Sequence, residues 1–243
     1  MQSPANPQSL NRFSYALNNP LKYTDPSGHI VTIEGVNVND LDNKVNSGDY
    51  MWFMRNGGVF SRPLVRAYGT LRQVAPRLTG YVERSSQVIS ISMSSATNHL
   101  ADFIPGISEG GSILVNPALI ANFENNTVAG ALGHELFHSA ITIGTGNKDN
   151  FAGPEAFAFS IQYAIEEKLD AFHLWGDQFS DINPWKPLEI LNPRLETAAD
   201  QLADISDTYT QGHWFWQRPW DIWPGDDPNG EKFLDVAKTV WVN

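Results

Sequence analysis

Alternating apolar and polar residues predict several strands in the first half of the chain. The segments HIVTIEGV (29–36) and SQVISISMSS (86–95) alternate with a period of two. That period places successive side chains on opposite faces of a sheet. A third segment, GSILVNP (111–117), predicts a strand that stops at its Asn-Pro pair.

Apolar residues at helical spacing predict helices over residues 61–75, 128–142 and 154–172. Asn126 or Thr127 can cap the second of these, since a side-chain oxygen there can accept from a free N–H of the first turn. Pro154 suits the first position of the third because its φ is already helical. Residues 193–210 suggest an exposed acidic helix, and residues 231–242 a short terminal helix or strand.

Composition narrows the class of protein. The 243 residues are 42% hydrophobic and carry a formal net charge of −11, which argues against nucleic acid and anionic lipid as partners. There is no cysteine, so disulfides, thiolate metal sites and cysteine nucleophiles are excluded. No apolar run is long enough to span a bilayer, and the N-terminus lacks the apolar core of a signal peptide. We therefore expect a cytoplasmic chain or one piece of a larger protein.

The segment HELFH within the second predicted helix indicates a metal site. His134 and His138 are one turn apart, so both imidazoles leave the same face of the helix and can hold a zinc ion. Glu135 lies beside that position, where it can take a proton from a water molecule and hand it to a leaving amine. Gly133 costs helix propensity, which suggests that another group approaches it closely.

A catalytic zinc site needs a third protein ligand, and no further histidine follows nearby on the helix. Glu155 is the preferred candidate because it opens the next helix and shares one face with Phe159, Gln162 and Glu166. An acidic residue at a helix start can also be there for the helix dipole alone. The other candidates are Glu166, Glu167, Asp149, Asp170 and His173. The run Glu166-Glu167-Lys168 is most simply a solvated helix end.

A tetrahedral transition state would need a donor for its oxyanion. Tyr163 on the third predicted helix is a candidate for this catalytic role, although a tyrosine at such a position more often packs in the core. His173 and His213 are further candidates.

The N-terminal segment NRFSYALNNPLKYTDPSG (11–28) resembles the end of the core of RHS-repeat (YD-repeat) proteins. The resemblance includes the DPxG motif at Asp25 to Gly28, which marks the end of a conserved shell in that family. A variable toxin domain commonly follows it. The resemblance implies two parts, a turn-rich remnant of the RHS core at 1–29 and a separate domain at 30–243. It also implies delivery to a target cell as part of a larger secreted RHS protein, with an immunity protein as a possible partner.

The residues His134, Glu135, His138 and Glu155 resemble the site of zincin metallopeptidases in their gluzincin form. The resemblance implies an α+β fold in which a small mixed or antiparallel sheet packs on the HExxH helix and a second helix carries a ligand. It implies a zinc (Zn²⁺) endopeptidase acting on a protein or peptide substrate, here as the toxin domain of a polymorphic bacterial effector. Zincins also place an edge strand beside the site, for which residues 112–116 are a candidate, an ordinary inner strand being the alternative.

The sequence allows two other interpretations. The segment HWFWQRPWDIWPG (213–225) holds four of the eight Trp residues. It can anchor a loop to the core, or it can bind a glycan or a protein surface in a degenerate, non-catalytic domain. In a third interpretation the zinc is structural and its fourth position is closed.

Overall fold

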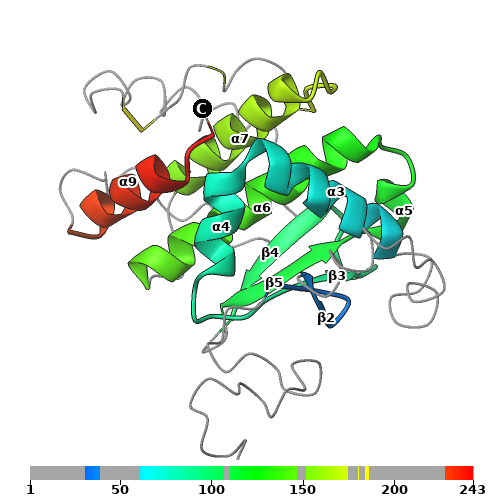
Figure 1. Ribbon diagram of the computed structural model, residues 1–243, viewed down its shortest axis with the longest axis horizontal. Helices are drawn as coiled ribbons and strands as arrows, with labels where there is room; N and C mark the ends of the chain where they lie inside the picture. Colours follow the sequence, from blue (N-terminus) through cyan, green and yellow to red (C-terminus); the bar gives the residue numbers. More distant parts are fainter. Residues whose placement is uncertain are drawn as a thin grey trace, which may run out of the picture.

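A five-stranded mixed sheet lies under layers of helices in the computed structural model of the chain (Figure 1). The structure describes residues 31–38, 61–106, 110–146, 152–174, 180, 184–185 and 228–242. The strands are β1 (Val31–Ile33), β2 (Val36–Asn37), β3 (Ile89–Met93), β4 (Ala101–Pro105) and β5 (Gly111–Val115), in the order β2-β1-β3-β5-β4. The expected α+β class and the expected small mixed sheet are both present.

The strand order corrects one expectation about the edge of the sheet. Strands β1, β3 and β5 are parallel, and β4 pairs antiparallel with β5, with Phe103 opposite Ile113. Because β5 is paired on both sides, residues 112–116 do not form an edge strand; the alternative of an ordinary inner strand is correct. The strand at that edge among the described residues is β4, which the apolar pattern did not predict.

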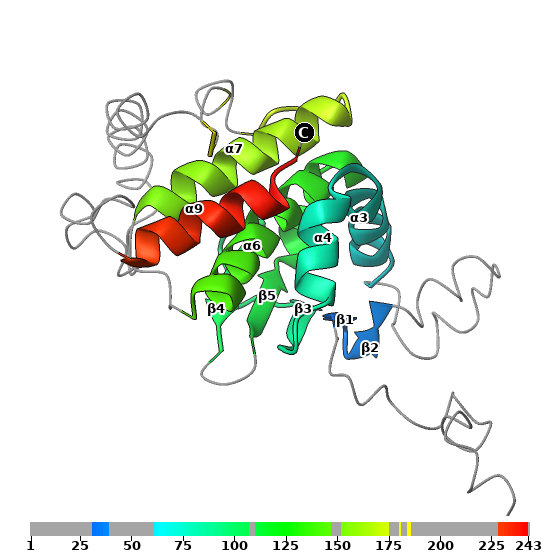
Figure 2. The same cartoon turned by 60° about the vertical axis from the view of Figure 1, so that its left-hand side comes forward.

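The helices of the described chain form two layers above the sheet. They are α3 (Ser61–Val74), α4 (Pro76–Glu83), α5 (Pro117–Ile120), α6 (Asn125–Thr145), α7 (Ala152–Lys168) and α9 (Pro228–Val240). Figure 2 shows α3, α4 and α6 over the sheet, with α7 and α9 on the far side of α6. None of the described helices is long and apolar enough to cross a membrane.

Helix α6 lies at the centre of the fold, where it contacts the strands β4 and β5 and the helices α3, α4, α7 and α9. Its residues from Thr127 to Thr142 are buried except Glu135, which is the one charged residue in the helix. A helix that is apolar on all sides is expected to be buried on all sides. Position 135 therefore places the one charged side chain of α6 against the backbone of β4.

The start of α6 differs from the prediction. The N-cap is Glu124, which makes no side-chain capping bond, and the helix begins at Asn125 rather than near residue 128. Asn125 and Asn126 instead donate across the fold, to Thr70 Oγ1 at 2.9 Å and to the Leu169 carbonyl at 3.1 Å. The predicted cap at Asn126 or Thr127 is wrong because tertiary partners use the asparagine side chains.

The other predicted helices need smaller corrections. Helix α7 starts two residues before Pro154 and ends at Lys168, because Asp170 has a φ of 51° that no helix continues through. The C-terminal segment is a helix and not a strand. Phe233 of α9 packs edge-on against Phe137 and Phe157, with ring centroids 6.2 and 5.2 Å apart, and so joins α9 to both α6 and α7.

Candidate metal centre

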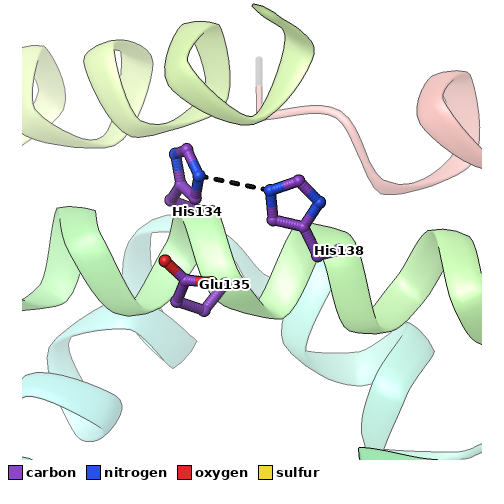
Figure 3. A group of neighbouring side chains, drawn as sticks. All are labelled: His134, Glu135 and His138. Carbon is purple, nitrogen blue, oxygen red and sulfur yellow. Dashed lines mark hydrogen bonds between the residues drawn. The ribbon is translucent and has the colours of Figure 1, made fainter. Parts of the chain in front are cut away.

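The histidines of HELFH point the same way, as their spacing predicts. Both imidazoles project from α6 toward α7, whereas Glu135 leaves the helix on another side (Figure 3). The two Nε2 atoms are 3.2 Å apart, and the residues are only 7% and 6% exposed. His134, Glu135 and His138 thus form a buried group on one helix that could bind a metal ion.

A second carboxylate, that of Glu155, lies closer to the two imidazoles. Its Oε2 is 3.3 Å from His134 Nε2, and its Oε1 is 3.3 Å from His138 Nε2. Each carboxylate oxygen thus faces a different imidazole, and these spacings are short enough for the three side chains to share one metal ion. The ligand atoms of His134, Glu135 and His138 are within 4.8 Å of one another. The shorter contacts favour Glu155 over Glu135 as the third donor.

The packing of α7 on α6 explains why Glu155 reaches this place. Phe159, one turn after Glu155, meets the His134 ring edge-on with centroids 4.4 Å apart. Glu166 reaches α6 as well, where it lies against Gly130. The face of α7 predicted from the three-and-four spacing is therefore the face that meets α6. Gly133 is also in close contact, as expected: a Cβ at this position would collide with Ile165 of α7.

The electrostatics favour the protonation states that a metal requires. Burial lowers the pKa of His134, so its imidazole is neutral and has a lone pair to offer. Burial by itself would raise the pKa of Glu155, but the charge of His138 and hydrogen bonds with both histidines outweigh it and hold that pKa below its usual range. The group therefore offers the His134 nitrogen and a charged carboxylate beside the His138 ring, and an ion that bound there would displace any proton from the nitrogens facing it.

Glu135 is held by the sheet. Its Oε2 accepts a hydrogen bond from the Phe103 backbone N–H of β4 at 2.8 Å. Burial raises the pKa of Glu135 to about 8, and the nearby carboxylates of Glu155 and Asp102 add to the rise. A cation bound between the histidines would oppose that rise by favouring the charged carboxylate. Glu135 is thus held at the edge of the group by the backbone of β4.

The donor set is of a kind that can hold a metal ion. Two imidazole nitrogens and one carboxylate are typical protein ligands of catalytic zinc, and hard cations such as Ca²⁺ and Mg²⁺ prefer all-oxygen sites. If Nε2 of His134 faces the ion, Nδ1 carries the proton. That Nδ1 is buried, and within the described part of the chain it has no hydrogen-bond partner. The residues that could hold an ion here are His134 and His138, with Glu155 or Glu135 as a further donor.

The structure places Tyr163 and Glu166 away from this centre. Tyr163 stacks on His173 with ring centroids 4.4 Å apart and lies eight residues after Glu155, a helical rise of about 12 Å. This placement does not support Tyr163 or His173 as the oxyanion donor. Glu166 is 1% exposed and accepts from Gln162 Nε2 at 2.7 Å and from the Leu174 N–H at 3.2 Å. The prediction of a solvated Glu166 is therefore wrong, whereas Glu167 and Lys168 are exposed.

A histidine and an aspartate near the centre were missed by the sequence analysis. His99 Nδ1 is 2.6 Å from Asp102 Oδ1, and Thr97 Oγ1 donates to the other carboxylate oxygen. The hydrogen bond with Asp102 raises the pKa of His99 against the effect of burial, and the charge of Glu155 contributes to the rise. Asp102 belongs to β4, so this pair could have been found only if that strand had been predicted.

Several expectations concern residues outside the described ones. They are the DPxG segment at 11–28, the acidic helix at 193–210, the Trp-rich segment at 213–225, and the candidates Asp149 and His213. Comparisons with protein-family models, with curated proteins and with solved structures find no match to this chain.

Proposed function

We propose that this chain is a zinc-dependent endopeptidase of the gluzincin type. The observation that carries the proposal is the convergence of His134, His138 and Glu155, whose facing atoms are 3.2–3.3 Å apart. Glu135 adds a carboxylate that lies next to this set without being its closest member. Hydrolysis of an amide needs such a pairing of an electrophile with a nearby proton carrier.

Each residue would have a separate role in the proposed hydrolysis. Zinc, when bound by His134, His138 and Glu155, supplies Lewis acidity at that point. Glu135 takes the proton of the attacking water and gives it to the nitrogen of the departing amine, so the carboxyl group ends in the form in which it began. Strand β4 lies at the edge of the described sheet beside Glu135, where an extended peptide substrate could run past the catalytic carboxylate.

The biological setting that we propose is that of a toxin domain. The segment at 11–28, which resembles the end of an RHS core, supports delivery of the peptidase as the C-terminal part of a larger secreted protein. The substrate would be a protein of the target cell, and an immunity protein in the producing cell would be the matching partner. The net charge of −11 supports a protein substrate rather than a nucleic acid.

Metal analysis and a cleavage assay test the enzymatic part of this proposal. The purified chain should contain one zinc ion, His134→Ala should lose it, and Glu135→Gln should keep it. Glu135→Gln should reduce cleavage of fluorescent casein by about 100-fold or more, because general acid–base catalysis of this kind contributes 10²–10⁴-fold. Wild type without zinc, or a Glu135→Gln variant with unchanged cleavage, contradicts the proposal.

Expression in cells tests the toxin part separately. Wild type should slow growth, and Glu135→Gln should not. Equal toxicity of the two proteins at equal abundance would show that harm to the cell does not depend on hydrolysis. Glycan or protein binding that survives removal of the metal would instead favour a non-catalytic binding domain.

A further inference from the structure

The backbone of β4 has one side that β5 does not use. In the described chain β4 is the last strand of the sheet. Leu100 accepts from the Asn116 N–H at 3.0 Å, and Gly106 donates to the Gly110 carbonyl at 3.3 Å. In an antiparallel ladder alternate residues point to the same neighbour, so the even-numbered positions from 100 to 106 face β5. The odd-numbered positions, Ala101, Phe103 and Pro105, face outward.

The outward amide of Phe103 is the one that reaches Glu135. Its N–H donates to Glu135 Oε2 at 2.8 Å, which agrees with the alternation. Of the other two outward positions, Pro105 has no N–H to donate. A carboxylate from the central helix is thus tied to one defined point on the edge of the sheet.

Phe103 is itself firmly placed. Its ring lies over Gly111 of β5, where an added Cβ would collide with the ring and with the Ile104 carbonyl. Phe103 is opposite Ile113, which is fully buried. The amide that holds Glu135 is therefore part of a packed strand, and its position is set by the core and not by the site.

We propose that the Phe103 backbone N–H is a positioning group for Glu135. It holds Oε2, so that Oε1 is the oxygen that takes the proton of the attacking water and returns it to the departing amine. The hydrogen bond stands on the geometry of β4 and α6, whereas its catalytic use rests on the proposed peptidase function. The hydrogen bond ties one oxygen of the Glu135 carboxyl group to the strand and so favours one rotamer of Glu135.

The hydrogen bond can be tested without any activity, in the protein treated with a chelator. An outward amide on an edge strand exchanges its hydrogen rapidly unless a partner protects it. The Phe103 amide should be protected in wild type, and Glu135→Ala should speed its exchange by about tenfold or more. The amides of Asp102 and Ile104, which face β5, are the internal controls and should change little. Equal exchange of the Phe103 amide in both proteins overturns the inference.

Its catalytic use can be tested with proline, which removes the N–H and is tolerated at outward positions of edge strands. Phe103→Pro is compared with Phe103→Ala, which loses the same ring but keeps the amide. Ala101→Pro controls for a proline at the same edge. Relative to Phe103→Ala, Phe103→Pro should lower kcat for fluorescent casein about 10- to 100-fold, with unchanged KM and zinc affinity.

The outcomes separate this inference from the function it builds on. An unchanged or higher kcat in Phe103→Pro overturns the positioning role, since the bond would then be irrelevant or inhibitory. If Phe103→Pro does not fold, the exchange measurement on Glu135→Ala decides the hydrogen bond. A wild type that binds no zinc and cleaves no casein overturns the peptidase function and the catalytic use with it, but leaves the exchange result valid.

Discussion

Two glutamates on α7 face α6, and their surroundings make them chemically different. Glu155 meets the Nε2 atoms of two histidines, which hold its pKa below the usual range. Glu166 lies eleven positions further along the helix, about 16 Å away, and accepts from the Gln162 amide and the Leu174 backbone. Burial raises the pKa of Glu166, and those two hydrogen bonds only partly oppose it.

The difference shows that the hydrogen-bonding and charged partners of a glutamate at the α6–α7 contact decide what its carboxylate does. The imidazoles of His134 and His138 favour the charged form of Glu155 and bring nitrogen and oxygen atoms close together, in a group that could bind a metal ion. Amide donors instead saturate the Glu166 oxygens and fasten the chain after α7 to the helix. One end of the α6–α7 contact is suited to chemistry, and the other end to holding the helices together.

The largest expected effect is on zinc affinity. Glu155→Gln should weaken zinc binding by about 100-fold or more, since even outer-shell partners of metal ligands contribute 10–100-fold. Glu166→Gln is the matched control on the same face of the same helix and should bind zinc like wild type. A competition titration with a chromophoric chelator measures both. Wild-type affinity in Glu155→Gln would point to Glu135 as the third ligand and remove the contrast.

The next effect is on stability. Glu166→Ala should lower the free energy of unfolding by about 1–3 kcal/mol, because the Leu174 N–H and the Gln162 amide lose their acceptor. Zinc affinity should not change. The exposed neighbour provides the control, and Glu167→Ala should stay within about 0.5 kcal/mol. Urea unfolding of wild type and the two variants measures these free energies. Equal losses in Glu166→Ala and Glu167→Ala would mean that the hydrogen bonds of Glu166 do not stabilise the fold.

A smaller effect is expected from the glycine that makes room for Glu166. A Cβ at Gly130 would be 2.7 Å from Glu166 Cγ and 2.8 Å from its Oε1. Gly130→Ala should therefore cost about 1 kcal/mol despite the better helix propensity of alanine. Gly69 of α3 has nothing within 4 Å of an added Cβ, so Gly69→Ala should stabilise by about 0.5–1 kcal/mol. Thermal unfolding of both variants measures these changes. If Gly130→Ala raises the stability as Gly69→Ala does, the Glu166 side chain moves aside without cost.

The smallest effect is a slope with pH. The pKa of Glu166 is higher in the folded than in the unfolded chain, so the folded protein binds this proton more tightly. Its contribution to stability is fully present below the unfolded value of about 4.3 and is lost as pH rises through the folded pKa. Relative to Glu166→Gln, wild type should lose unfolding free energy as the pH rises above the unfolded value of about 4.3 and through the raised folded pKa. If wild type instead gained unfolding free energy relative to Glu166→Gln as the pH rises, the pKa of Glu166 would be lowered by folding and not raised.

The parts of the site that follow from local spacing could be predicted from the sequence. The four-residue interval between His134 and His138 determines that both rings share a face of α6, whatever that helix packs against. The same rule identified the face of α7 that carries Glu155. Both helices are long and rich in apolar residues, so the local sequence of each segment was enough to predict a helix there.

Features that depend on contacts between residues far apart in the sequence could not be predicted. Strand β4 has the sequence ADFIP, in which no clean alternation is visible and proline ends the run, so its place beside β5 comes from pairing. Glu166 sits in the charged run Glu-Glu-Lys and looks solvated. It is buried only because Gly130, on another helix, leaves space for it. The hydrogen bond from Phe103 to Glu135 needs both the strand and the helix in place.

The candidate ligands come from two helices that belong to different layers, and this has a thermodynamic consequence. An ion that binds His134 and His138 on α6 together with Glu155 on α7 has its full set of donors in the folded chain alone. Such an ion ties one layer to the next and shifts the unfolding equilibrium by mass action. Each tenfold rise in free zinc above the dissociation constant would add about 1.4 kcal/mol to the stability of the fold. The melting temperature of this protein would then report the zinc concentration of the compartment that it enters.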